Sequence, residues 1–93
     1  MTTASFIVFH ILIKYEYEAQ DILKKIKEGL SFQEAARKFS ICASASNGGL
    51  LGAFKPGRFV EAFEEGLENL AMNTVSAPVR TPFGYHLILK QPA

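Results

Sequence analysis

The chain has 93 residues, of which 48% are hydrophobic and 20% are charged, and its net charge is +1. This length supports one hydrophobic core, so we expect residues 1–93 to form a single domain. The composition excludes a disordered chain, and the near-neutral charge argues against a nucleic-acid-binding protein.

The first third of the chain predicts a strand followed by two helices. Residues 6–13 are β-branched, aromatic or aliphatic on both alternating faces, which is typical of a buried central strand. Residues 16–28 carry apolar side chains at the helical period, with acidic residues early and basic residues late, as the helix dipole favours. Ser31 and Glu34 form a capping box that begins the second helix.

The middle of the chain predicts a loop, a short strand and a third helix. Residues 40–49 are mostly small and polar, which indicates a loop with at most one helical turn. A short strand is expected over 50–54. The spacing of apolar side chains predicts a helix over 60–70, weakened by Gly66.

The chain ends with two predicted strands, which together with the first strand set the fold class. Residues 75–80 predict an edge strand, because Pro78 has no N–H for the sheet. Residues 84–90 are apolar on both faces and predict a second central strand. We therefore expect an α+β domain with a mostly antiparallel sheet whose first and last strands lie in the centre.

Both histidines lie in apolar strand segments, His10 in His-Ile-Leu-Ile-Lys and His86 in His-Leu-Ile-Leu-Lys. If the two strands are neighbours, the imidazoles can point into one layer and hydrogen-bond. Each needs a partner, because burying an unpartnered polar group costs about 1–3 kcal/mol. The pattern alone is more typical of two core histidines that only stabilise the fold. A metal site is poorly supported, since Cys42 alone could add a third ligand.

Cys42 is the sole cysteine and lies in the polar loop, so no internal disulfide can form. A Cys–His pair is one arrangement for nucleophilic catalysis, but no orienting residue or oxyanion motif accompanies it. A thiol beside a polar site is the favoured interpretation. The first five residues lack the basic cluster of a signal peptide, and residues 6–13 are too short to span a bilayer. We therefore expect a cytoplasmic, monomeric protein without a membrane partner.

Four motifs in order, covering nearly the whole chain, resemble the parvulin family of peptidyl-prolyl cis/trans isomerases. They are His-Ile-Leu-Ile-Lys at 10–14, Ser-Ile-Cys at 40–42 with Gly-Gly-Leu-Leu-Gly-Ala-Phe at 48–54, Gly-Arg-Phe-Val-Glu-Ala-Phe at 57–63, and Val-Ser-Ala-Pro-Val-Arg-Thr-Pro-Phe-Gly-Tyr-His at 75–86. Each motif alone is weak evidence, and the four together are specific. The coincidence of two histidines in apolar strands then has an explanation.

The resemblance implies a four-stranded sheet surrounded by about four helices, an FKBP-like arrangement, and an active site without cofactor or metal. It implies that His10 and His86 are paired beneath the substrate, that Thr81 supports their hydrogen bonds, and that Cys42 faces the substrate carbonyl. It also implies a proline-binding pocket formed by Leu51, Phe59, Phe63 and Phe83. The expected partners are proline-containing peptides and unfolded polypeptides.

Such a site suits rotation about an X-Pro bond, which breaks no bond. The barrier of about 18–20 kcal/mol arises from amide resonance. An apolar pocket that grips the proline ring and desolvates the carbonyl favours the twisted amide over the planar one. We therefore interpret Cys42 as part of the electrostatic environment of the carbonyl and not as a nucleophile.

Three features of this sequence depart from the family pattern or refine it. Leu50 stands where the motif usually has Asp, which leaves open an alternative: a non-catalytic, chaperone-like domain that binds proline peptides. Phe59 replaces the common Met and is expected to stiffen the pocket. Residues 15–18 are Tyr-Glu-Tyr-Glu, where phosphate-directed parvulins resemble one another in carrying a basic cluster. An acidic loop repels phosphoserine, so we expect activity that does not depend on phosphorylation.

Overall fold

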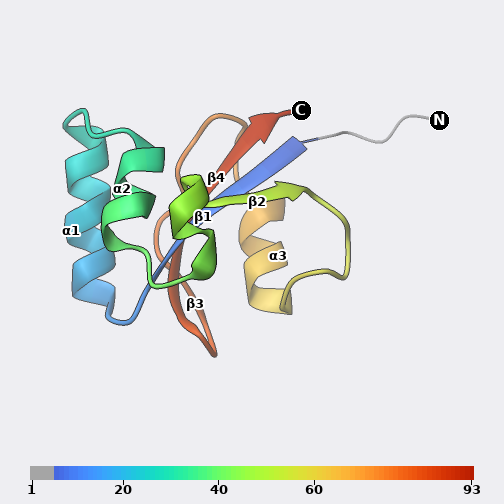
Figure 1. Cartoon of the computed structure of the whole chain (residues 1–93). Coiled ribbons are helices and arrows are strands. Elements are labelled where there is room, and N and C mark those ends of the chain that lie inside the picture. The colour runs from blue at the N-terminus through green and yellow to red at the C-terminus, as the bar shows by residue number, and fades with distance from the viewer. Residues whose placement is uncertain (1–5) are drawn as a thin grey trace.

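The computed structural model describes residues 6–93, which are built around one antiparallel sheet with the strand order β2-β1-β4-β3 (Figure 1). The strands are β1 (Phe6–Ile13), β2 (Leu50–Ala53), β3 (Val79–Thr81) and β4 (Gly84–Pro92). The first and last strands lie in the centre, as the sequence predicted. The expectation about a signal peptide concerned residues 1–5, which lie outside the described residues.

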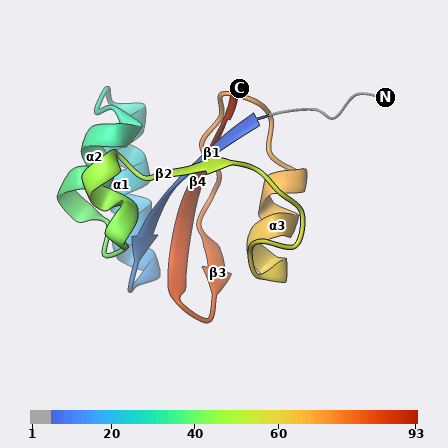
Figure 2. The same cartoon turned by 45° about the vertical axis from the view of Figure 1, so that its right-hand side comes forward.

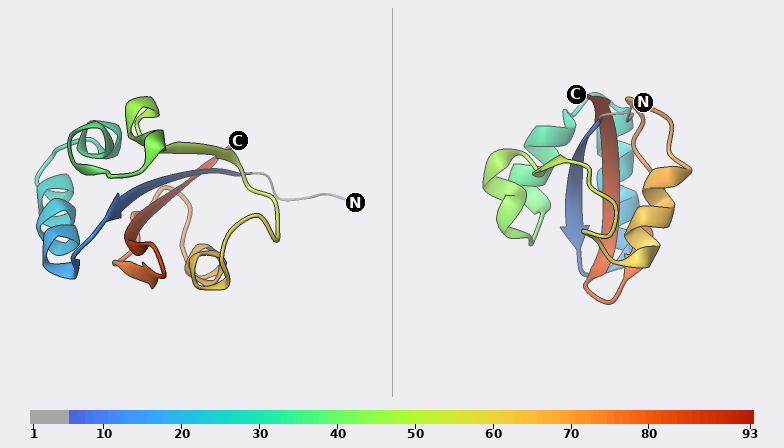
Figure 3. Two further views of the ribbon diagram at one scale, coloured as in Figure 1. Left: turned by 60° about the horizontal axis from the view of Figure 1, so that its bottom comes forward. Right: turned by 90° about the vertical axis from the view of Figure 1, so that its right-hand side faces the viewer.

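The α-helices cover both faces of this sheet. α1 (Glu16–Lys27) and α2 (Phe32–Phe39) lie on one side, and α3 (Glu61–Glu68) lies on the other (Figures 2 and 3). The predicted capping box is present at the start of α2, where the Glu34 backbone N–H donates to the Ser31 side chain at 3.1 Å. The α+β class predicted from the sequence is therefore confirmed.

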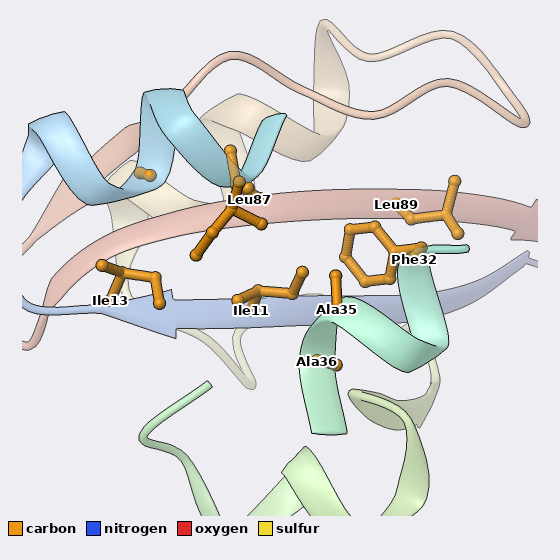
Figure 4. Close-up of a cluster of buried hydrophobic side chains, with 9 residues drawn as sticks. Ile11, Ile13, Phe32, Ala35, Ala36, Leu87 and Leu89 are labelled. Carbon is orange, nitrogen blue, oxygen red and sulfur yellow. The ribbon is translucent and has the colours of Figure 1, made fainter. Parts of the chain in front are cut away.

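The period-two alternation of β1 and β4 sorts the buried side chains into two hydrophobic clusters. Ile11, Ile13, Leu87 and Leu89 pack against α1 and α2 (Figure 4). Val8 and Ile88 point to the other face and pack with two buried side chains of α3. Because successive strand residues alternate between faces, the even-numbered His10 and His86 share the α3 face with Val8 and Ile88.

The helix count is slightly lower than the four expected. The described residues contain three α-helices and one 3₁₀ helix, η1 (Ala43–Asn47). The sequence of η1, Ala-Ser-Ala-Ser-Asn, contains residues that bond their own backbone and compete with α-helix formation. Gly48 adopts a left-handed conformation and ends the segment.

The strand expected over 75–80 is shorter in the structure. Only Val79–Thr81 forms β3, while Val75 makes an isolated bridge to Leu89. Pro78 separates the two pieces, because a residue without an N–H interrupts the ladder. β3 nevertheless lies at the sheet edge, where Pro78 predicted it.

Gly49 holds the Cys42 loop against β1 at a distance that no side chain permits. The His10 backbone N–H donates to the Gly49 carbonyl at 2.9 Å. Gly49 has φ +87°, and a Cβ there would lie 2.5 Å from the His10 carbonyl oxygen. The backbone of the first histidine is thus fixed by a contact that only glycine allows.

We expect Gly49→Ala to lower the free energy of unfolding by about 3 kcal/mol, because it adds a backbone clash to an unfavourable positive φ. Gly57→Ala is the matched control: Gly57 has φ +83°, with no atom within 4 Å of an added Cβ. The control should lose about 1 kcal/mol. Urea denaturation measures both, and equal losses would show that the clash relaxes at no cost.

Candidate active site

His10 and His86 lie beside each other on the α3 face of the sheet. In the β1–β4 register His10 is opposite Ile88, and Leu12 is opposite His86, so the histidines are diagonal neighbours. Their Nδ1 atoms are 2.9 Å apart, and their ring centroids are 5.1 Å apart. The structure thus brings together two residues separated by most of the chain, as the sequence predicted.

Thr81 extends this contact into a hydrogen-bonded chain. Its hydroxyl oxygen is 2.7 Å from Nε2 of His86, and it accepts the Phe83 backbone N–H at 3.2 Å. The short hairpin between β3 and β4 brings Thr81 and His86 together. One ring nitrogen of His86 therefore contacts His10 and the other contacts Thr81, which fixes the ring plane.

Burial makes both imidazoles neutral at physiological pH. Desolvation lowers the pKa of His86 to about 4, and desolvation together with repulsion from His86 lowers the pKa of His10 to about 4. The Nδ1–Nδ1 hydrogen bond needs a donor on one ring and a lone pair on the other, so a neutral pair satisfies it. A doubly charged pair would place two donors face to face.

A largely apolar cavity of about 380 Å³ opens above the two imidazoles. Phe63 from α3 stands over them, with its ring centroid 5.1 Å from that of His86 and 5.8 Å from that of His10. Phe59 stacks on Phe63 at 4.8 Å. We call this hollow the proline cavity; its walls are His10, Leu12, Cys42, Leu51, Arg58, Phe59, Val60, Phe63, Phe83 and His86.

The structure places seven of the eight sequence-predicted site residues on the wall of this cavity. The eighth, Thr81, does not line the cavity and is connected to it only by its hydrogen bond to His86. Three further residues line the cavity and were not expected from the sequence: Leu12, Arg58 and Val60. Leu12 could have been found from strand alternation, because it lies on the same face of β1 as His10. The other two could have been found because they are next to Phe59 in the sequence.

The Cys42 loop is anchored to β1 without the acidic residue that the family motif carries. Ser40 Oγ accepts the backbone N–H groups of Leu12 at 3.0 Å and of Cys42 at 3.3 Å, and the Ile41 N–H donates to the Leu12 carbonyl at 2.9 Å. Leu50, at the position of that acid, is exposed to solvent. The loop is therefore held by other groups, whereas Nε2 of His10 is buried without a hydrogen-bond partner among the described residues.

The described part of the chain offers no evident metal centre, because no three side chains of His, Cys, Asp or Glu gather there. Nor does any helix within residues 6–93 have the length and apolar character needed to cross a membrane. The groups that remain for chemistry are the neutral imidazole pair, the half-buried Cys42 thiol and the apolar wall of the proline cavity.

Comparison with known proteins agrees with this geometry. The family model of the PPIC-type PPIase domain, or rotamase, matches residues 10–91. The chain belongs to the parvulin family. It is 49% identical over 90 residues to the chaperone SurA of Methylobacillus flagellatus, covering 87% of this chain and 21% of that protein. A parvulin-like PPIase of Rickettsia conorii is 45% identical over 85 residues, covering 87% and 30%.

Solved structures confirm the fold. PrsA from Bacillus subtilis superposes with a TM-score of 0.91 at 37% identity, covering 97% of this chain and 36% of that one. NmPin, the parvulin of Nitrosopumilus maritimus, gives 0.87 at 35% identity, covering 98% and 99%. The chain thus spans less than a third of the two curated relatives named above and nearly all of the solved NmPin chain.

The lowered pKa values of the two histidines predict that acid destabilises the domain below pH 6.5. Between pH 6.5 and about 4 the histidines bind protons in the unfolded chain but stay neutral in the folded one. The free energy of unfolding is therefore highest above pH 6.5 and falls as the pH drops. Each histidine accounts for up to about 3 kcal/mol. Urea denaturation between pH 5 and 7.5 should show this slope.

A His10→Leu/His86→Leu double variant is the control for this titration, because it removes both groups together and leaves neither imidazole unpartnered. Its stability should be flat between pH 5 and 6.5. A flat profile in the unmodified protein would contradict the assignment of neutral, buried imidazoles.

Proposed function

We propose that this domain accelerates cis/trans isomerisation of X-Pro peptide bonds in flexible or unfolded polypeptides, without a covalent intermediate. The observation that carries the proposal is the apolar cavity whose floor is a neutral, hydrogen-bonded histidine pair. The membership of this chain in the parvulin family supports the same reaction.

The cavity suits the physical demands of the rotation. Phe59, Phe63 and Leu51 offer an apolar cup for the proline ring, which anchors one side of the bond. The carbonyl on the other side loses water beside Cys42, and desolvation weakens the resonance that keeps the amide planar. The neutral imidazoles add no net charge that would stabilise the more dipolar planar form.

The alternative of a binding domain without activity rested on Leu50. In the structure this side chain is exposed on β2, and the Cys42 loop is held by Ser40 and Gly49 instead. Catalysis is therefore the better-supported proposal. The relatives carry the names chaperone SurA, foldase protein PrsA and parvulin-like PPIase, which supports proline-containing peptides and unfolded proteins as partners.

Several expectations from the sequence stay predictions. They are the single-domain organisation, the monomeric state, the cytoplasmic location, and the absence of cofactor, metal, nucleic-acid and membrane partners. The absence of phosphate dependence is also a prediction, which the exposed Glu16 and Glu18 at the start of α1 support.

Phe63→Ala should lower kcat/KM on an Ala-Pro peptide about tenfold, mainly through a higher KM, because the cup loses the ring that faces the proline. NMR exchange spectroscopy measures the rate. Since Phe63 is also buried, Phe59→Ala serves as a second, half-buried variant expected to act in the same direction. Met72→Ala, which removes a side chain outside the cavity, is the control. Unchanged kinetics in both phenylalanine variants would show that the pocket is misplaced.

A peptide with phosphoserine before proline should be isomerised no faster than its unphosphorylated twin. Residues 15–18, which follow β1, carry two carboxylates and no basic cluster that would attract its charge of about −1.5 to −2. Parallel exchange measurements on the two peptides test this at one ionic strength. Faster turnover of the phosphopeptide would overturn the prediction.

A further inference from the structure

The carboxylate of Glu64 holds the backbone of Phe59, which forms part of the wall of the proline cavity. Glu64 lies in the first turn of α3, and its Oε2 atom accepts the Phe59 backbone N–H at 3.0 Å. Both residues are half-buried. The proposed isomerisation uses the Phe59 ring in the apolar cup and assigns no role to Glu64.

The start of α3 lacks the polar N-cap side chain that α2 has. Its N-cap is Val60, which makes no side-chain capping hydrogen bond, whereas Ser31 makes one at the start of α2. Backbone N–H groups at and just before a helix start have no partner within the helix, so other groups must satisfy them. At α3 the carboxylate of Glu64 comes from inside the helix and reaches back past Val60 to Phe59.

This contact is the one hydrogen bond that the Phe59 backbone makes within residues 6–93. The turn before it is closed by the Arg58 N–H, which donates to the Lys55 carbonyl at 3.2 Å. The helix after it begins with the Glu64 N–H, which donates to the Val60 carbonyl at 3.1 Å. Phe59 lies between these two anchored pieces of chain, so its own main chain is held by the carboxylate alone.

Stacking by itself does not fix the place of the Phe59 ring. The ring stacks on Phe54 at 6.3 Å and on Phe63 at 4.8 Å between centroids, and the Arg58 guanidinium lies 5.6 Å from its centre. Aromatic pairs are stable over centroid distances of about 4.5 to 7 Å, so a stacked ring can slide. An N–H···O hydrogen bond confines its two heavy atoms to a range of about 0.5 Å. The carboxylate contact is therefore the tighter constraint on Phe59.

We propose that Glu64 is a positioning residue for substrate binding: its carboxylate sets where Phe59 stands on the wall of the proline cavity. Glu64 does not line the cavity and acts through Phe59. Loss of the contact should weaken the grip on the proline ring, measured as KM, and leave the rotation step, measured as kcat, almost unchanged. This inference rests on the proposed function, because it assigns a residue to the proline pocket of that isomerase.

Two substitutions separate the hydrogen bond from the charge. Glu64→Gln removes the charge but keeps a side-chain oxygen that reaches the Phe59 N–H. Glu64→Asp keeps a charge near the helix start but is one methylene shorter, so its oxygen falls short of that N–H. Glu61→Gln is the matched control, because it removes an exposed carboxylate from the same turn of α3. NMR exchange spectroscopy on an Ala-Pro tetrapeptide gives KM and kcat, at a temperature where urea denaturation shows every variant folded.

We expect Glu64→Asp to raise KM about threefold with little change in kcat. Glu64→Gln should raise KM less than about 1.5-fold, because a neutral acceptor holds the N–H less strongly than a carboxylate but in the same place. Glu61→Gln should match the unmodified protein. The amide signal of Phe59 reports the contact directly, and it should shift most and exchange with solvent fastest in Glu64→Asp.

The opposite order, with KM raised in Glu64→Gln and normal in Glu64→Asp, would show that the charge acts on the helix dipole and would overturn the inference. A KM for Glu64→Asp equal to that of the unmodified protein would overturn it as well, and would leave the isomerase intact. An unmodified protein that does not accelerate exchange in the tetrapeptide would instead overturn the proposed function.

Discussion

The antiparallel pairing of β1 with β4 is the constraint on which the site depends. Its register sets His10 and His86 diagonally on one face, where their Nδ1 atoms meet at 2.9 Å. A slip of one residue would turn either imidazole to the opposite face and bury it among aliphatic side chains without a partner. The hydrophobic alternation that excludes such a slip therefore also protects the histidine pair. Folding and chemistry are specified by the same periodicity.

The pair in turn explains why the cavity is apolar and neutral. An imidazole held at a pKa of about 4 carries no charge near pH 7, so no counter-ion is needed beneath the substrate. Phe63 covers both rings edge-on and completes the desolvation that lowers the pKa values. Removing water from this floor is also what an X-Pro carbonyl requires in order to lose resonance. Burial thus stabilises the neutral state of the site and favours the twisted state of the substrate.

The sequence predicted the residues whose environment is set by local pattern. Strand alternation located both histidines on buried strands, the motif order located Cys42 and the phenylalanines, and the capping box located the start of α2. It did not predict that the edge strand is interrupted at residues 76–78, because Pro78 was interpreted as an edge marker and not as an interruption. Nor did it predict a second hollow, which is lined by residues of β1, α1 and the chain after α2. These segments are distant in the sequence, and no periodicity in any one of them encodes where they meet.

The contact between β1 and the Cys42 loop connects these observations. The Leu12 N–H donates to Ser40 Oγ and the Leu12 carbonyl accepts the Ile41 N–H, while the next residue, Cys42, lines the proline cavity. Cys42 therefore lines the proline cavity from a backbone that is hydrogen-bonded to β1, the strand that carries His10. The thiol and the imidazole pair thus share one support. A substrate carbonyl beside Cys42 meets a wall whose position is set by the same strand that positions the histidines.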